Sequence, residues 1–295
     1  MKRVHCFSFA AIIALFCLSF TVSAADSAYT ARDAGAGMIV INSENLHTAD
    51  TILVFTPGNN SSTAEEMRVK GPNMPTVILL HGWSGCWKNW SDKYDIQRIA
   101  DSTGFRIICP DGFYASWYVN HADSQKMQYR TFFDEEFFPQ MKERFNLTEE
   151  NTFITGLSMG GHGAISLFLN HPERYRAAGS MSGVLDLRDT KIKDLMTTCG
   201  DSTRLVKECC VERLESMKDT LKALNRTMIV SCGYSDGLFC STEKFSAKCR
   251  QLGINHMAIF SPGVHSWAYW GYALQLHLTA FRRILNKENQ GYYEK

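Results

Sequence analysis

A serine-centred turn between a strand and a helix constrains the fold of this chain more than any other segment. Residues 151–155, Asn-Thr-Phe-Ile-Thr, are predicted to form a strand, and residues 161–170 a helix. Between them the sequence reads G-x-S-x-G, with Ser158 at the centre. A strand that turns directly into a helix strains the backbone at the apex and leaves room only for small neighbours. The pattern predicts Ser158 as an exposed nucleophile; the alternative is a tight turn with an incidental serine.

Short apolar runs alternate with helical patterns over most of the chain. The runs that predict strands are residues 38–41, 51–55, 76–80, 105–109, 151–155, 177–181, 228–232 and 257–260. The segments that predict helices are residues 90–103, 129–145, 161–170, 214–224, 242–252 and 267–284. Pro139 is expected to kink the second of these helices. Such alternation predicts an α/β fold, a mainly parallel sheet with helices on both faces.

The N-terminus has the pattern of a secretory signal peptide. Lys2 and Arg3 precede an apolar run at residues 7–22, and small residues suited to cleavage follow, ending at Ala24. A membrane anchor is the alternative, although the run has no basic stop-transfer flank. We therefore expect a signal peptide at residues 1–24, a single domain at residues 25–295, and a secreted or periplasmic protein that does not stay in the membrane after cleavage.

The charge balance argues against partners, such as nucleic acids or anionic membranes, that bind a protein through its overall charge. The chain has 31 Lys and Arg against 30 Asp and Glu, a formal net charge of +1. Loss of the two basic residues of the signal peptide leaves the mature chain near neutrality. A chain this close to neutral has no electrostatic basis for nucleic-acid or anionic-membrane binding, so neither partner is expected.

Eight of the 10 cysteines lie beyond the signal peptide. They are Cys86, Cys109, Cys199, Cys209, Cys210, Cys232, Cys240 and Cys249. An even number in an exported chain predicts disulfides, of unassigned pairing. Buried thiols are the alternative for Cys109 and Cys232, which lie in strand-like runs. No metal-site spacing such as C-x-x-C occurs, and neither a metal nor a cofactor is expected.

The partners that a serine nucleophile needs can be placed by chain order. In this architecture an acid and then a histidine follow the serine, on loops after later strands. His265 lies in the loop after the last predicted strand, and Asp236 in the loop after the strand before it. Asp186, after an earlier strand, is the alternative acid. The sequence thus predicts a relay of Ser158, His265 and Asp236.

Two backbone amides are expected to form an oxyanion hole. One belongs to Met159, the residue after the nucleophile, and the other to a loop after an early buried strand. In that loop Gly82 permits close approach of the backbone, so the second donor is predicted to be the N–H of Trp83. His81 is expected to brace the loop rather than to act in catalysis.

Several further segments carry a family resemblance together with the serine turn. They are Leu-Leu-His-Gly at 79–82, Pro-Asp-Gly at 110–112, Ser-Trp-Tyr at 116–118, Gly-Leu-Ser-Met-Gly-Gly at 156–161, His-Pro-Glu at 171–173, Ser-Met-Ser-Gly at 180–183 and His-Ser-Trp-Ala-Tyr-Trp at 265–270. From about residue 38 to residue 285 the chain resembles the esterase branch of the α/β-hydrolases. That branch includes secreted acetylxylan and feruloyl esterases, S-formylglutathione hydrolases and mycobacterial mycolyltransferases.

The resemblance implies the α/β-hydrolase fold and the same five site residues. Ser158 would be the nucleophile, His265 the base and Asp236 the acid, with amide donors at Trp83 and Met159. A cysteine-containing insertion at residues 186–211, here called the insertion, departs from the family pattern.

These observations predict a secreted serine carboxylesterase that removes acetyl or feruloyl groups from plant polysaccharide through an acyl-enzyme. The alternatives are a mycolyltransferase-like acyltransferase, a thioesterase like S-formylglutathione hydrolase, and a non-catalytic carbohydrate-binding module. Exposed rings could stack on a sugar or phenol; the candidates are Trp83, Trp87, Trp117 and Trp267, with core packing as the alternative for each. N-x-[ST] glycosylation sequons occur at Asn59, Asn60, Asn89, Asn146 and Asn225.

Overall fold

The computed structural model describes residues 36–58 and 74–286. The predicted signal peptide and the sequons at Asn59 and Asn60 lie outside these residues. The strands are β1 (Ala36–Ser43), β2 (Thr48–Phe55), β3 (Thr76–Leu80), β4 (Arg106–Cys109), β5 (Thr152–Gly156), β6 (Ala177–Met181), β7 (Thr227–Gly233) and β8 (His256–Ser261). The α-helices are α2 (Asn89–Lys93), α3 (Ile96–Thr103), α4 (Tyr129–Phe132), α5 (Phe138–Phe145), α6 (Met159–Asn170), α7 (Lys193–Cys199), α8 (Ser202–Glu208), α9 (Cys210–Leu224), α10 (Phe239–Leu252) and α11 (Trp267–Leu285).

The strands form one 8-stranded sheet in the order β1-β2-β4-β3-β5-β6-β7-β8. β1 and β2 are antiparallel, and β2 also runs antiparallel to β4. From β4 to β8 every neighbouring pair is parallel. The predicted α/β fold with a mainly parallel sheet is confirmed. The parallel strands end at one common edge, where loops far apart in the chain meet.

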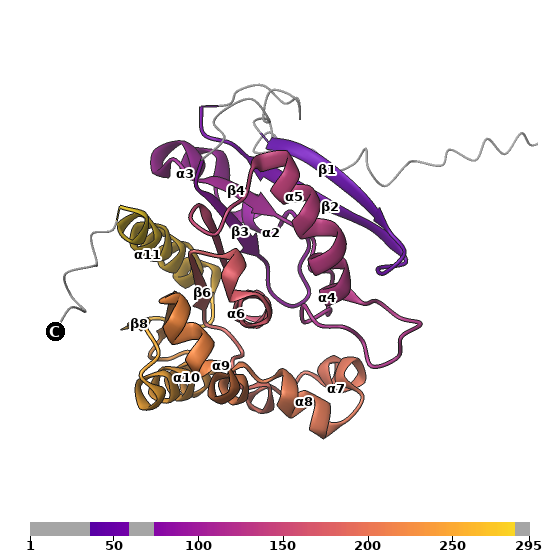
Figure 1. Cartoon of the computed structure of the whole chain (residues 1–295), viewed down its shortest axis with the longest axis vertical. Helices are drawn as coiled ribbons and strands as arrows, with labels where there is room; N and C mark the ends of the chain where they lie inside the picture. The colour runs from indigo at the N-terminus through magenta and orange to yellow at the C-terminus, as the bar shows by residue number, and fades with distance from the viewer. Residues whose placement is uncertain (1–35, 59–73, 287–295) are drawn as a thin grey trace, which may run out of the picture.

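Helices cover both faces of this sheet, so its central strands are apolar on both sides (Figure 1). Along β3, Ile78 and Leu80 pack with α4, α5, α6, α9 and α10, whereas Val77 and Leu79 pack with α2, α3 and α11. Successive side chains of a strand point to opposite faces, so both faces need apolar residues. This explains the continuous apolar runs in the sequence.

The predicted helix at residues 90–103 is two helices, α2 and α3. Between them Tyr94 is extended, with φ −136° and ψ 151°. The carboxylate of Asp95 then caps α3 by accepting a hydrogen bond from the amide of Arg98 at 2.9 Å. An aspartate that binds the backbone in this way favours a new helix start over helix continuation. The prediction of one continuous helix is therefore wrong.

The predicted helix at residues 129–145 is interrupted by a π-helical segment, Phe133–Phe137, between α4 and α5. Pro139 lies in the first turn of α5, which continues directly from the π-helical segment because Phe137 and Phe138 are themselves helical. The ring and missing N–H of Pro139 do not fit the hydrogen bonding of an α-helix to the preceding turn. The departure from α-helical geometry therefore precedes Pro139 instead of centring on it.

The insertion contains helices that the sequence patterns did not reveal. It begins with a short 3-10 turn, Leu187–Asp189, and continues as α7 and α8. The side chain of Asp201 caps α8 by accepting a hydrogen bond from the amide of Arg204 at 2.8 Å. Helices of 7 residues are too short to show a clear periodic pattern.

Candidate active site

Ser158 occupies the turn between β5 and α6 in a strained backbone conformation, with φ 52° and ψ −116°. A Cβ atom on Gly156 would lie 2.5 Å from the carbonyl oxygen of Gly160. A Cβ atom on Gly160 would lie 2.4 Å from the carbonyl oxygen of His81. Both distances are far below van der Waals contact, so this turn can form only with glycine on both sides of the serine.

The structure brings Ser158, His265 and Asp236 together from three separate loops. His265 Nε2 lies 3.1 Å from Ser158 Oγ. His265 Nδ1 lies 3.0 Å from each carboxylate oxygen of Asp236. An ionised carboxylate only accepts hydrogen bonds, so the imidazole proton is on Nδ1 and Nε2 is free to accept from the serine hydroxyl. This is the arrangement in which an imidazole can take a proton from a serine.

Asp236 is held in its ionised form although it is buried. Burial alone would raise the pKa of Asp236, but hydrogen bonds from His265, from the Leu238 amide and from Ser182 outweigh it and lower this pKa below its usual value. The Leu238 amide donates to Asp236 Oδ1 at 2.9 Å. A carboxylate fixed in this way orients the imidazole at neutral pH.

Asp186, the alternative acid, does not reach His265. Its carboxylate accepts hydrogen bonds from Arg188 Nε at 2.7 Å and Arg188 Nη2 at 2.9 Å. Lys244 Nζ lies 3.6 Å from the same carboxylate. Asp186 is therefore part of an ion-pair cluster at the start of the insertion.

The loop after β3 lies against the serine turn. A Cβ atom on Gly82 would lie 2.5 Å from Leu157 Cδ1 and 3.5 Å from Ser158 Cβ. The amide of Trp83 follows directly in this loop. Met159 is the first residue of α6, and the first N–H groups of a helix have no acceptor within it. Both predicted amide donors therefore adjoin Ser158 in the fold.

His81 holds the Gly82–Trp83 peptide in place. The amide of Gly112 donates to His81 Nε2 at 2.7 Å, so the ring proton is on Nδ1. His81 Nδ1 then donates to the carbonyl oxygen of Gly82 at 2.8 Å. Because a trans peptide points its C=O and N–H in opposite directions, this bond turns the Trp83 N–H away from His81. The predicted bracing role of His81 thus has a defined geometry.

The tryptophans proposed to stack on substrate differ in exposure. Trp83 is 36% exposed and packs edge-on against Tyr114, at 5.0 Å between ring centroids. Trp87 and Trp267 are half-buried, and Trp267 packs edge-on against Trp90 and Trp270.

Trp117 is fully buried, and its ring packs edge-on against His162. The prediction that Trp117 stacks on substrate is therefore wrong, because no face of this ring is open to a ligand. The residue is apolar enough to fill the core beside α6, and its burial is decided by tertiary packing that a short sequence motif does not encode.

Two residues that support the site were not singled out from the sequence. The ring of Trp270 lies perpendicular to that of His265, at 4.8 Å between centroids. Ser182, after β6, adjoins Asp236 and has φ 49°. Both lie within motifs that carry the family resemblance, so motif membership was the available signal.

The predicted disulfides are wrong: within residues 36–58 and 74–286 the cysteines are thiols. The sulfurs of the neighbouring Cys209 and Cys210 point to different parts of the core. Cys209 Sγ donates to the carbonyl of Leu205 at 3.4 Å, and Cys210 Sγ to the carbonyl of His162 at 3.7 Å. Burial raises the pKa of Cys210 to about 12. These thiols act as small core residues.

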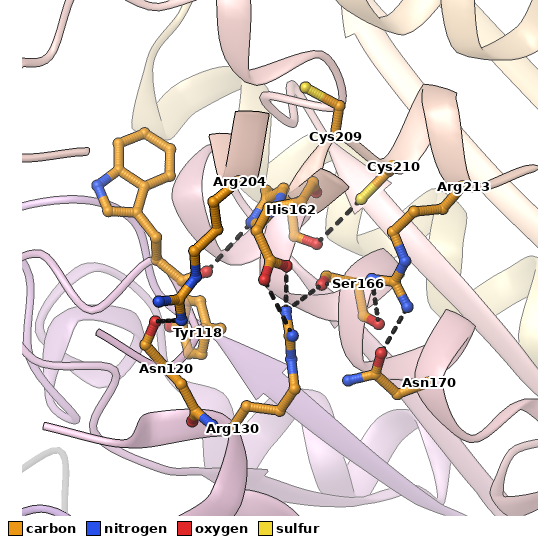
Figure 2. A network of polar contacts seen from close by, with 12 residues as sticks. Tyr118, Asn120, Arg130, His162, Ser166, Asn170, Arg204, Cys209, Cys210 and Arg213 are labelled. Carbon is orange, nitrogen blue, oxygen red and sulfur yellow. Dashed lines mark hydrogen bonds and ion pairs between the residues drawn. The ribbon is translucent and has the colours of Figure 1, made fainter. Parts of the chain in front are cut away.

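Buried polar contacts join the insertion to α6, the helix that follows Ser158 (Figure 2). His162 Nε2 of α6 lies 3.2 Å from the carbonyl oxygen of Glu208 in α8. The Glu208 carboxylate pairs with Arg130 of α4, with Arg130 Nη1 at 3.1 Å from Oε1. Burial raises the pKa of Glu208, but Arg130 outweighs this effect and keeps it below the usual value. The insertion therefore packs against α4 and α6 as an integral part of the fold.

Residues 36–58 and 74–286 contain neither a metal-binding group nor a membrane-spanning helix. Their His, Cys, Asp and Glu side chains form no group of three or more arranged to hold a metal ion. None of their helices combines the length and apolar character needed to cross a membrane.

Comparison with known proteins identifies a family. The sequence model described as "Putative esterase" matches residues 65–281, well over half of the chain. The chain is 24% identical to a diacylglycerol acyltransferase/mycolyltransferase of Mycobacterium tuberculosis, over 79% of this chain and 80% of that protein. It is also 24% identical to an acetyl esterase of Caldicellulosiruptor saccharolyticus, over 77% of this chain and 91% of that protein.

Solved structures show the same fold. A ferulic acid esterase superimposes with a TM-score of 0.72 at 23% identity, over 85% of this chain and 98% of that chain.

Proposed function

The chain belongs to the esterase family of α/β-hydrolases, and on that basis we propose that it is a serine carboxylic-ester hydrolase acting through an acyl-enzyme on Ser158. The observation that carries the proposal is the unbroken hydrogen-bonded series from Ser158 Oγ through His265 to Asp236. A strained serine alone would be a weak nucleophile, whereas a serine within reach of an oriented imidazole is an activated one.

In the proposed mechanism Ser158 Oγ attacks the ester carbonyl while His265 Nε2 takes the hydroxyl proton. Asp236 stays ionised and stabilises the imidazolium that forms. The amides of Trp83 and Met159 donate hydrogen bonds to the oxyanion of the tetrahedral intermediate. The intermediate collapses when His265 gives the proton to the leaving alkoxide, which departs as the alcohol. A water molecule, deprotonated by His265 in turn, then hydrolyses the acyl-enzyme.

The chemistry is tested by trapping the nucleophile. Wild type should react with a fluorophosphonate probe and release a burst of p-nitrophenol from p-nitrophenyl acetate, with the adduct at Ser158 by peptide mass spectrometry. Ser158→Ala should lose both signals, and Ser102→Ala, on the solvent side of α3, should keep them. Retention of most esterase activity by a folded Ser158→Ala protein would refute the proposal. A carbohydrate-binding module without catalysis would not react with the probe.

We propose an acetyl or feruloyl group on plant polysaccharide as the substrate. Trp83 and Tyr114 present exposed rings beside the loop that adjoins Ser158, and such rings can stack on a phenolic or sugar ring. The similarity to an acetyl esterase and to a ferulic acid esterase supports acetyl and feruloyl esters as substrate classes. A panel of acetyl, feruloyl and longer acyl esters tests this. Tyr114→Ala should reduce kcat/KM for the feruloyl ester more than for the acetyl ester, and an equal effect on both would exclude stacking.

Acyl transfer is the second candidate function. It is supported by the similarity to a mycobacterial acyltransferase. Transfer would use the same acyl-enzyme, with a hydroxyl group of a sugar attacking it in place of water. Adding trehalose or glucose to the assay and measuring acylated sugar against free acid separates the two. A product ratio that favours the acylated sugar in dilute aqueous solution would assign transfer.

We also propose that the protein is exported through the N-terminal signal. The support is the basic start, apolar run and small cleavage residues of residues 1–24. N-terminal sequencing of the mature protein should begin at Ala25, and a mature protein that retains Met1 or its apolar run would refute export by cleavage.

A further inference from the structure

A histidine that is not part of the proposed relay, His277, is fully buried. His277, in α11, has Nδ1 at 2.9 Å from Thr155 Oγ1 and Nε2 at 3.0 Å from Ser231 Oγ. A neutral imidazole has one donor and one acceptor nitrogen, and a hydroxyl can serve as either. Both contacts are therefore satisfied without a charge. Burial lowers the pKa of His277 to about 3, so this ring is neutral near pH 7.

The imidazole of His277 reaches two strands that are not neighbours. β6 lies between β5, which carries Thr155, and β7, which carries Ser231. Gly179 of β6 makes this possible, because a Cβ atom there would lie 2.5 Å from His277 Nδ1 and 2.7 Å from Thr155 Oγ1. The ring thus crosses β6 and ties β5 to β7 from the face that α11 covers.

Each of the three elements joined in this way leads to one member of the proposed relay. Thr155 lies three residues before Ser158 in the chain. Ser231 lies five residues before Asp236. α11 begins two residues after His265.

We propose that His277 is a positioning residue that sets the separation of the β5, β7 and α11 ends and so the distances within the relay, a role that rests on the proposed esterase function. Packing alone does not require an imidazole here. Apart from the two hydroxyls, the ring packs against Phe281, at 6.2 Å between ring centroids, and an apolar side chain in its place would need no hydrogen-bond partners. A displacement of about 1 Å at a reacting group can reduce a rate by about a hundredfold.

The test compares His277→Leu, which removes both contacts, with His277→Gln, whose amide can donate at one end and accept at the other. Ile284→Ala is the matched control, because Ile284 is a buried residue of the same helix remote from both hydroxyls. Circular dichroism establishes a temperature at which all variants are folded. There the rate of fluorophosphonate labelling and the kcat, KM and pH profile for p-nitrophenyl acetate are measured.

We expect His277→Leu to lower kcat by about ten- to a hundredfold with KM within about twofold of wild type, and to shift the pH midpoint of kcat/KM. His277→Gln should recover part of kcat, and Ile284→Ala should lose stability but keep kcat and the pH midpoint. If His277→Leu does not fold, the double variant Thr155→Val/Ser231→Ala removes both partner hydroxyls and is expected to give the same decrease in kcat.

Failure of the positioning role and failure of the proposed esterase function would give different results. A folded His277→Leu protein, or a folded double variant, with wild-type kcat, labelling rate and pH midpoint would overturn the positioning role while Ser158 labelling in wild type still supported the esterase. Absence of Ser158 labelling in wild type would instead overturn the proposed function, and the positioning role with it.

Discussion

Replacing His81 by alanine should slow catalysis while leaving substrate binding nearly unchanged. His81 holds the carbonyl oxygen of Gly82 at 2.8 Å, and this bond sets the direction of the Trp83 N–H in the same peptide. In the proposed mechanism that N–H binds the oxyanion, which exists only in the transition state and the tetrahedral intermediate. An interaction made only there affects kcat rather than KM.

The magnitude follows from what remains after the substitution. Complete loss of an oxyanion donor lowers kcat by about 10²–10³-fold. The Gly82 carbonyl would keep its hydrogen bond from the amide of Gly85 at 3.2 Å, so the peptide is loosened rather than released. We therefore expect a loss of about ten- to a hundredfold, or about 1.4–2.7 kcal/mol of transition-state stabilisation. The Gly112 amide, left buried without its acceptor, should destabilise the fold by about 1–3 kcal/mol.

The assay is steady-state hydrolysis of p-nitrophenyl acetate together with inhibition by a trifluoromethyl ketone. The ketone forms a tetrahedral oxyanion on the serine, so its affinity should fall by the same factor as kcat. His171→Ala is the control, because His171 pairs with Asp134 and Glu173 away from this loop. A folded His81→Ala protein with wild-type kcat and inhibitor affinity would refute the reasoning.

Three further predictions concern ionised and buried groups. Asp236→Asn should lower kcat by about 10³–10⁴-fold, because an amide favours the wrong imidazole tautomer, whereas Asp186→Asn should retain activity; equal losses in the two variants would contradict the assignment of the acid. Glu208→Gln leaves Arg130 paired with a neutral group, and urea unfolding should show a loss of about 3–5 kcal/mol; a loss below 1 kcal/mol would mean that water screens the pair. The folded-state pKa of His277 lies below its unfolded value, so its stabilising effect is full above about pH 6.5 and is lost as pH falls toward about 3. Between pH 6.5 and pH 5 wild type should lose about 2 kcal/mol more than His277→Gln in urea unfolding, and parallel curves would show that burial does not lower the pKa of His277.

Strand positions could be predicted closely because both faces of the central sheet are buried. β3 and β6 coincide with predicted apolar runs to the residue. Helix interruptions could not be predicted in the same way. The break at Tyr94 depends on the hydrogen bond that the Asp95 carboxylate accepts from the amide of Arg98. The π-helical segment lies in the turn before Pro139, where the ring and missing N–H of the proline do not fit α-helical hydrogen bonding. Such local contacts change a helix without changing its apolar periodicity.

At the site, the residues whose positions follow from the order of strands and loops could be predicted. The burial and contacts of individual side chains could not. Ser158, Asp236 and His265 follow strands, and the topology of a parallel sheet brings the loops after those strands together. Trp83 and Trp117 were both candidates for stacking on substrate, yet one is exposed and the other fully buried. The cysteines likewise gave an even count, but pairing depends on the direction of each sulfur in the folded core.

Loops carry the proposed relay, and loops are the most mobile parts of a domain, so the structure must supply fixed contacts that hold them. His81 fixes the peptide after β3, and Ser182 hydrogen-bonds the carboxylate of Asp236. The perpendicular ring of Trp270 limits rotation of His265. Each of these side chains comes from a strand end or a helix start, where backbone hydrogen bonds restrict movement. Reacting groups must be held to within about 0.5 Å, and contacts from rigid elements can meet this requirement where the loops alone cannot.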